Sequence, residues 1–204
     1  MLKLTNLNQF YGQSHTLWDI SLEVQKGECL CVMGRNGVGK TTLMDTIMGQ
    51  HKIESGTIEF DGEDITKLSV EDRASLGIGY VPQGRQIFPL LTVEENLKIG
   101  IGARRDGLKA VPKAIYDMFP VLYDMRHRQG GDLSGGQQQQ LAIGRALVID
   151  PKLIIFDEPT EGIQPNIVSE IAEIMRRLNK EIGLTVLLVE QKLPFARKMG
   201  DRFY

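Results

Sequence analysis

The sequence predicts an α/β fold with a parallel core sheet, antiparallel strands at the N-terminus and an inserted block of helices. Short strand patterns alternate with helical patterns, as in α/β proteins. Two continuous apolar runs, at 153–156 and 186–189, are typical of parallel strands buried on both faces. Strand patterns are missing from about 86 to 149, where we expect the helical block. With 204 residues, the chain is long enough for one domain with a sizeable core.

The N-terminal strands come first along the chain. Turns at Tyr11-Gly12 and Lys26-Gly27 separate three apolar-rich runs. The third run leads into a glycine-rich loop, and we expect a helix from about Lys40. Two more strands follow, and Pro82 ends the second of them. The five expected strands are 2–8, 17–24, 28–33, 56–62 and 78–81.

Capping signals mark the helices of the inserted block. Thr92 and Glu95 have the spacing of a capping box and open a helix. Pro112 suits a first helical position, and Ser134 precedes a helical stretch at 136–148. Beyond the 153–156 strand, apolar residues with steps of four, three and four predict an amphipathic helix. These are Ile167, Ile171, Ile174 and Leu178.

Composition excludes several classes of protein. The chain has 24 Lys and Arg residues and 26 Asp and Glu residues, which gives a net charge of −2. This balance gives no general electrostatic reason to expect binding to nucleic acid. Cys29 and Cys31 are two apart on a strand and are interpreted as buried small hydrophobic residues. No apolar run approaches the ~18 residues of a membrane span, and no signal pattern opens the chain. We expect a cytosolic protein, with Arg104-Arg105 and Arg126-His127-Arg128 as solvated charge.

The glycine-rich loop is a phosphate-binding motif. Its residues match G-x-x-x-x-G-K-[ST], with a strand before and a helix after. Glycines let backbone N–H groups surround a phosphate, and the helix N-terminus adds its positive dipole end. Lys40 can reach the β and γ phosphates, and the Thr41 hydroxyl can bind Mg²⁺. The motif predicts a P-loop NTPase with a RecA-like core that binds ATP and Mg²⁺. Its candidate residues are Gly34, Arg35, Asn36, Gly37, Val38, Gly39, Lys40, Thr41 and Thr42.

Two carboxylates follow the 153–156 strand. Ligands bind at the carboxyl edge of a parallel sheet, which is where Asp157 and Glu158 are expected. Asp157 suits a Mg²⁺ ligand, and Glu158 suits a base that polarises the attacking water.

A third motif resembles the signature of the ATP-binding cassette (ABC) ATPases. It consists of Leu133, Ser134, Gly135, Gly136 and Gln137. Physically it is a second anion site, made of a serine hydroxyl and glycine N–H groups at a helix N-terminus. The resemblance covers the whole chain. It divides the chain into an ATP-binding core (1–85 and 150–204) and a helical subdomain (86–149).

The resemblance implies roles for further residues. Tyr11 matches the aromatic residue that stacks on adenine, and Gln83 the loop glutamine that reaches Mg²⁺ and the attacking water. Residues 161–164 match the loop that crosses the dimer interface. Many relatives have Asp at the end of this loop, where this chain has Gln164. This difference puts in doubt an ion-mediated link across the interface at that position. Gln191 occupies the position of a switch histidine. Relatives also continue past Tyr204, so the edge of the core sheet is expected to be uncovered.

The Gln191 departure narrows the resemblance to ATPases of branched-chain amino-acid and amide importers. Within these, 34–41 and 81–85 look most like the urea importer's ATPase. The resemblance implies a peripheral subunit on the cytoplasmic face of the inner membrane. Its partners would be a second ATP-binding subunit, membrane-spanning permease subunits met near 84–97, and indirectly an extracytoplasmic solute-binding protein. A non-transport ABC ATPase and a P-loop kinase stay open as alternatives.

Overall fold

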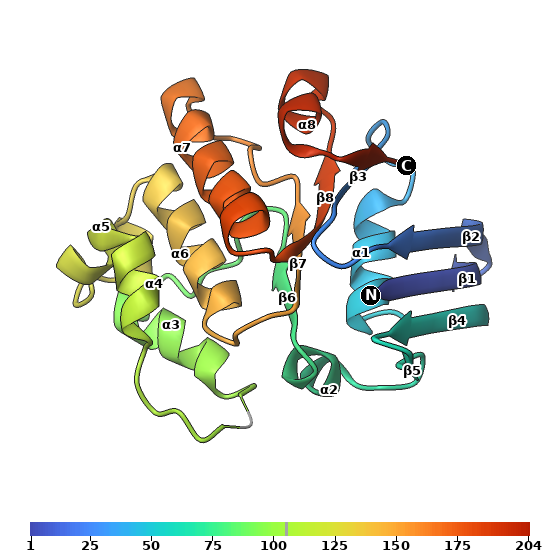
Figure 1. Cartoon of the computed structure of the whole chain (residues 1–204), viewed down its shortest axis with the longest axis horizontal. Coiled ribbons are helices and arrows are strands. Elements are labelled where there is room, and N and C mark those ends of the chain that lie inside the picture. The colour runs from blue at the N-terminus through green and yellow to red at the C-terminus, as the bar shows by residue number, and fades with distance from the viewer. Residues whose placement is uncertain (105) are drawn as a thin grey trace.

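Two β-sheets organise the chain (Figure 1). The computed structural model describes residues 1–104 and 106–204. An antiparallel sheet has the strand order β2-β1-β4-β5, and a parallel sheet has the order β6-β7-β8-β3-β9. The strands of the first sheet are β1 (Leu2–Tyr11), β2 (Ser14–Val24), β4 (Ser55–Phe60) and β5 (Glu63–Asp64). Those of the second are β3 (Cys29–Met33), β6 (Ile78–Val81), β7 (Leu153–Asp157), β8 (Thr185–Glu190) and β9 (Arg202–Phe203).

Helices cover both faces of the parallel sheet. Helix α1 (Lys40–Met48) lies between the two sheets (Figure 1). On the other face lie α6 (Gly135–Leu147), α7 (Pro165–Arg176) and α8 (Leu193–Met199). The remaining helices are α2 (Val70–Ser75), α3 (Val93–Ile101), α4 (Lys113–Met118) and α5 (Pro120–Asp124), with a 3-10 turn (Gly130–Asp132) before α6 and a π-helical turn (Arg177–Glu181) after α7.

The apolar side chains of the central strands alternate between two cores. In β7, Ile154 and Phe156 pack with α6 and α7, whereas Leu153 and Ile155 pack with α1 and the antiparallel sheet. This burial on both faces explains the continuous apolar runs. The α/β fold predicted from the sequence, with its N-terminal antiparallel strands and helical insertion, is confirmed.

Most of the local expectations are confirmed. Thr92 and Ser134 both cap helices through capping boxes, and both cysteines are free and buried. Strands β1 and β2 are longer than expected, because they pair up to Tyr11 and Ser14, the two residues that flank their turn. Pro112 is the N-cap of α4 and not its first residue, so that expectation is wrong by one position.

The structure contradicts the expectation that Arg104 is solvated charge. Its side chain is only 16% exposed, pairs with Asp106 and donates to the Val148 carbonyl over 2.9 Å. It therefore fastens the end of α3 to the end of α6 and is not solvated charge. Arg105 lies outside the described residues. Within the described part of the chain, no helix is long and apolar enough to cross a membrane.

Arg73 anchors α1, the helix that follows the phosphate loop. It lies in α2, is 2% exposed, and burial lowers its pKa. Its guanidinium donates to four carbonyls, those of Thr46 and Ile47 at the end of α1 and those of Thr66 and Leu68. A cation here satisfies the carbonyls and complements the negative end of the helix dipole.

We predict that Arg73→Met lowers the free energy of unfolding by about 3 kcal/mol or more, because it leaves buried carbonyls unpaired. Urea unfolding measures this, with Arg197→Met on the exposed face of α8 as the matched control. A loss no larger than that of the control would show that Arg73 does not anchor α1.

Candidate functional site

The phosphate loop joins the end of β3 to the start of α1. Gly37 and Gly39 have φ angles of 80° and 96°, a left-handed region that favours glycine. Gly39 is also the N-cap of α1, so no side chain caps this helix. The first N–H groups of α1 are therefore available to an anion, as the motif predicts.

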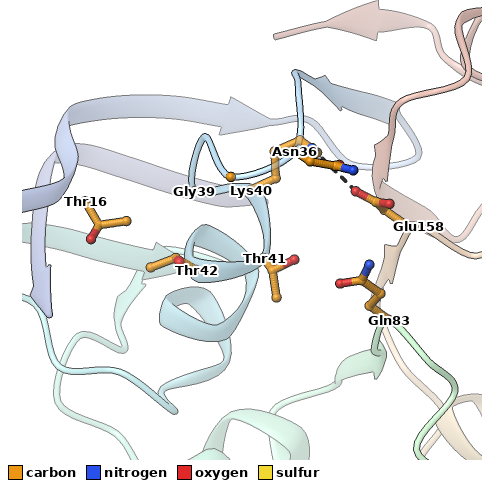
Figure 2. A pocket seen from close by; sticks show the side chains of 9 residues that line it. Thr16, Asn36, Gly39, Lys40, Thr41, Thr42, Gln83 and Glu158 are labelled. Atoms are coloured by element: carbon orange, nitrogen blue, oxygen red, sulfur yellow. Dashed lines mark ion pairs between the residues drawn. The ribbon is translucent and has the colours of Figure 1, made fainter.

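Lys40 is buried within this loop. Its Nζ donates to the carbonyls of Gly34 and Arg35 over 2.9 Å each. The same Nζ lies 3.4 Å from Glu158 Oε1 (Figure 2). The loop lysine and the candidate base, which lie far apart in the sequence, are thus an ion pair.

A cavity of about 300 Å³ opens beside Lys40 (Figure 2). The structure brings eight of the sequence-predicted residues to it: Asn36, Gly37, Gly39, Lys40, Thr41, Thr42, Gln83 and Glu158. Thr16, from β2, also lines it, and sequence reasoning missed it because no motif marks the residue. The other predicted residues lie outside this lining: Tyr11, Gly34, Arg35, Val38, Ser134, Gly135, Gly136, Gln137, Asp157 and Gln191.

Asp157 lies at the buried end of β7, close to Thr41. Its carboxylate is fully buried, and neither oxygen has a hydrogen-bond partner within the described residues. Burial raises the pKa of Asp157 to about 6, the negative charges of Glu158 and Asp45 add to the rise, and the positive charge of Lys40 opposes it. Buried oxygens without partners, next to a hydroxyl, fit a hard cation such as Mg²⁺.

Glu158 links two loops. Its φ of 49° is unusual for a non-glycine residue. Gln191 Nε2, from the loop after β8, donates to Glu158 Oε2 over 2.5 Å. A second cavity of about 280 Å³, lined by Asn36, Glu158, Thr160 and Gln191 among others, lies on this side. Each oxygen of Glu158 thus has its own partner, Lys40 for Oε1 and Gln191 for Oε2.

Gln83 follows β6 and faces the first cavity (Figure 2). Its Nε2 donates to Glu161 Oε2 over 2.8 Å. The family resemblance matches Glu161 to a loop at the dimer interface, but nothing in the sequence indicates this bond. Arg85 extends the same link, since it donates to Gln138 of α6 and to the Gly162 carbonyl, both over 3.3 Å.

The Ser134 segment forms the exposed N-terminus of α6. Ser134 Oγ accepts from the Gln137 N–H, and the Gln137 side chain accepts from the Ser134 N–H. A Cβ on Gly136 would lie 2.5 Å from Ile167 of α7, so the second glycine is required for helix packing. None of these residues lines the cavity beside Lys40.

Tyr11 ends β1 and is half-exposed. Its hydroxyl hydrogen-bonds to His51 Nε2 over 2.7 Å, and the two rings meet edge to face. Contact of Tyr11 with a nucleotide base stays a prediction.

Comparison with known proteins identifies the family. A sequence model described as "ABC transporter" matches residues 17–161. The chain belongs to the ABC transporter family. It is an ATPase subunit with the family's ATP-binding domain.

The similarity to other ABC proteins covers all or nearly all of the chain. It is 41% identical to the high-affinity branched-chain amino acid transport ATP-binding protein BraG of Pseudomonas aeruginosa, covering 100% of this chain and 88% of BraG. It is 37% identical to the glutamate transport ATP-binding protein GluA of Corynebacterium glutamicum, covering 99% and 85%. It also matches a solved dimeric ATP-binding cassette, bound to ADP and Pi in a post-hydrolysis state, with a TM-score of 0.88 and 29% identity over 100% and 93% of the two chains.

We predict that Asp157→Asn stabilises the nucleotide-free ABC protein at pH 8 by about 2 to 3 kcal/mol. A carboxyl whose pKa is about 6 when folded and about 4 when unfolded stabilises the fold below pH 4, and this contribution is lost as the pH rises through 6. The difference between Asp157→Asn and wild type should therefore shrink as the pH falls toward 5.

Urea unfolding in EDTA at pH 5 and pH 8 measures this difference, with the exposed Asp124→Asn as control. Equal stabilities of Asp157→Asn and wild type at pH 8 would show that the carboxylate is not strained by burial.

Proposed function

We propose that the chain hydrolyses ATP as the nucleotide-binding subunit of an importer and acts as a dimer. The observation that carries the proposal is the separation of two anion-binding features. Lys40, Gln83 and Glu158 line one cavity, whereas Ser134 is exposed and neither it nor Gly135, Gly136 or Gln137 lines that cavity. A second subunit would bring its own Ser134 to the nucleotide, so that ATP binding and dimer closure become one event.

Each residue then has a proposed role. The N–H groups of 36–42 bind the phosphates, and Lys40 holds the β and γ phosphates. Thr41, Gln83 and Asp157 would hold Mg²⁺, which neutralises charge on the phosphates when bound. Glu158 orients and polarises the attacking water, and Gln191 donates a hydrogen bond toward the γ-phosphate.

ATP binding requires several partners to be exchanged. The Lys40 ammonium must turn from two carbonyls and Glu158 toward phosphate oxygens. Glu158 then loses its ion pair and can accept from water instead. Gln83 likewise has to leave Glu161 to reach the cation. In this proposal the base is therefore released by the same phosphate group that is to be hydrolysed.

The importer would supply the remaining partners. Permease subunits are proposed to contact 84–97, where Phe88 and Leu90 are 44% and 81% exposed. The subunit then lies on the cytoplasmic face of the membrane, and an extracytoplasmic binding protein delivers the solute. The second ATP-binding subunit is this chain or a sister cassette.

The solute is proposed to be a small polar organic molecule. An amino acid is supported by the similarity to BraG and GluA, which are ATP-binding proteins of branched-chain amino acid transport and of glutamate transport. A second candidate, urea or a short amide, is supported by 34–41 and 81–85, which resemble the corresponding runs of urea-importer ATPases.

We expect a strain lacking this gene to lose uptake of one radiolabelled solute among urea, leucine and glutamate. Plasmid copies of the wild type and of Glu158→Gln then separate transport from protein abundance, because only the wild type should restore uptake. Loss of leucine or glutamate uptake supports the amino-acid candidate, and loss of urea uptake the other. Unchanged uptake of all three would contradict both candidates.

We predict that Glu158→Gln lowers ATP turnover by about a hundredfold or more, the usual reach of general-base catalysis. ATP affinity should stay close to wild type, since the amide keeps the shape of the side chain. The purified variant is compared with Glu170→Gln, an exposed glutamate of α7. Turnover at the rate of that control would contradict the role of Glu158.

A further inference from the structure

Glu190 is a buried carboxylate that no motif assigns. It is the last residue of β8, is 2% exposed, and pairs in register with Met33, just before the phosphate loop. Within the described part of the chain, no cation forms an ion pair with it. Burying a carboxylate without a counter-charge is costly unless hydrogen bonds compensate for the lost water.

Three donors satisfy this carboxylate. The Thr160 hydroxyl donates to Oε1. The backbone N–H groups of Gln191 and Lys192 donate to Oε2 over 2.8 and 2.9 Å. Lys192 Nζ adds a reciprocal bond to the Thr160 carbonyl over 3.1 Å.

These bonds connect two loops that end neighbouring strands. Thr160 lies two residues after Glu158, beyond β7, and Gln191 lies directly after β8. Glu190 therefore fixes the backbone from which the Gln191 side chain reaches Glu158. Because a displacement of about 1 Å can cost a hundredfold in rate, such a clamp has catalytic consequences.

We propose that Glu190 is a positioning residue for ATP hydrolysis, which sets Gln191 against Glu158 and ties the two loops together. The inference rests on the proposed function of this site. Glu190 acts through geometry and not as a base, because both of its oxygens already accept hydrogen bonds inside the protein. A glutamine can reproduce the arrangement, with its carbonyl accepting from the two N–H groups and its amide donating to Thr160 Oγ1.

Steady-state ATPase assays and equilibrium binding of a fluorescent ATP analogue test the proposal on the full chain. We expect Glu190→Ala to lower kcat by about tenfold or more, with ATP affinity within about threefold of wild type. Glu190→Gln should recover most of kcat. Thr160→Val, which removes only the hydroxyl donor, should resemble Glu190→Ala, whereas Thr160→Ser should not. Thermal unfolding of each variant checks that it is folded. If Glu190→Ala does not fold, the comparison of Thr160→Val with Thr160→Ser tests the same contact.

A double-mutant cycle with Gln191→Ala separates positioning from general structural damage. If Glu190 acts through Gln191, Glu190→Ala has no further effect on kcat in the Gln191→Ala background. Multiplicative losses, or a Glu190→Gln variant as impaired as Glu190→Ala, would overturn the proposal. A wild-type chain without ATPase activity would instead overturn the proposed function. A fully active Gln191→Ala variant would show that Gln191 is not needed for hydrolysis, and it would overturn this inference as well.

Discussion

The constraint on which the site depends is the burial of the parallel sheet on both faces. Helix α1 covers one face of the sheet and α6, α7 and α8 cover the other, so functional groups can approach only at the ends of the strands. Met33, Val81, Asp157 and Glu190 end four strands at the same edge, and the loops that follow carry the phosphate-binding, carboxylate and amide residues. Packing of the strands, rather than contacts among the loops, therefore brings Lys40 and Glu158, which are 118 positions apart in the sequence, within 3.4 Å of each other.

Much of this could be predicted from the sequence, because strong local signals marked it. The apolar runs of β7 and β8, the capping box at Thr92, the helix that follows Ser134 and the loop before Lys40 all depend on neighbours in the chain. Pairings between distant side chains left no such signal. The bonds of Gln83 to Glu161 and of Glu190 to Thr160, and the four carbonyls on Arg73, depend on which loops the fold brings together. The interpretation of Arg104 as solvated charge is wrong for the same reason, since its carbonyl partner, Val148, lies at the end of α6, more than 40 positions away.

The charged and polar groups at this edge mostly have partners within the protein itself. Lys40 is held by two carbonyls and Glu158, Gln83 by Glu161, and Gln191 by Glu158. Asp157 is the exception, with two buried oxygens that lack partners among the described residues. A bound nucleotide and cation would thus supply partners for the Asp157 carboxylate. They would also replace the present partners of Lys40, Gln83 and Gln191. This gives a physical reason for coupling between ligand binding and rearrangement of the loops.

The central claim is that each ATP site is completed by the Ser134 segment of a second subunit. Sedimentation of Glu158→Gln with and without ATP tests it most directly, since bound ATP should persist in this variant. The account predicts a monomer without ATP and a dimer with it, and it predicts that adding Ser134→Arg abolishes the dimer while each chain still binds ATP. A Glu158→Gln chain that stays monomeric with ATP bound, or a dimer that tolerates Ser134→Arg, would contradict it.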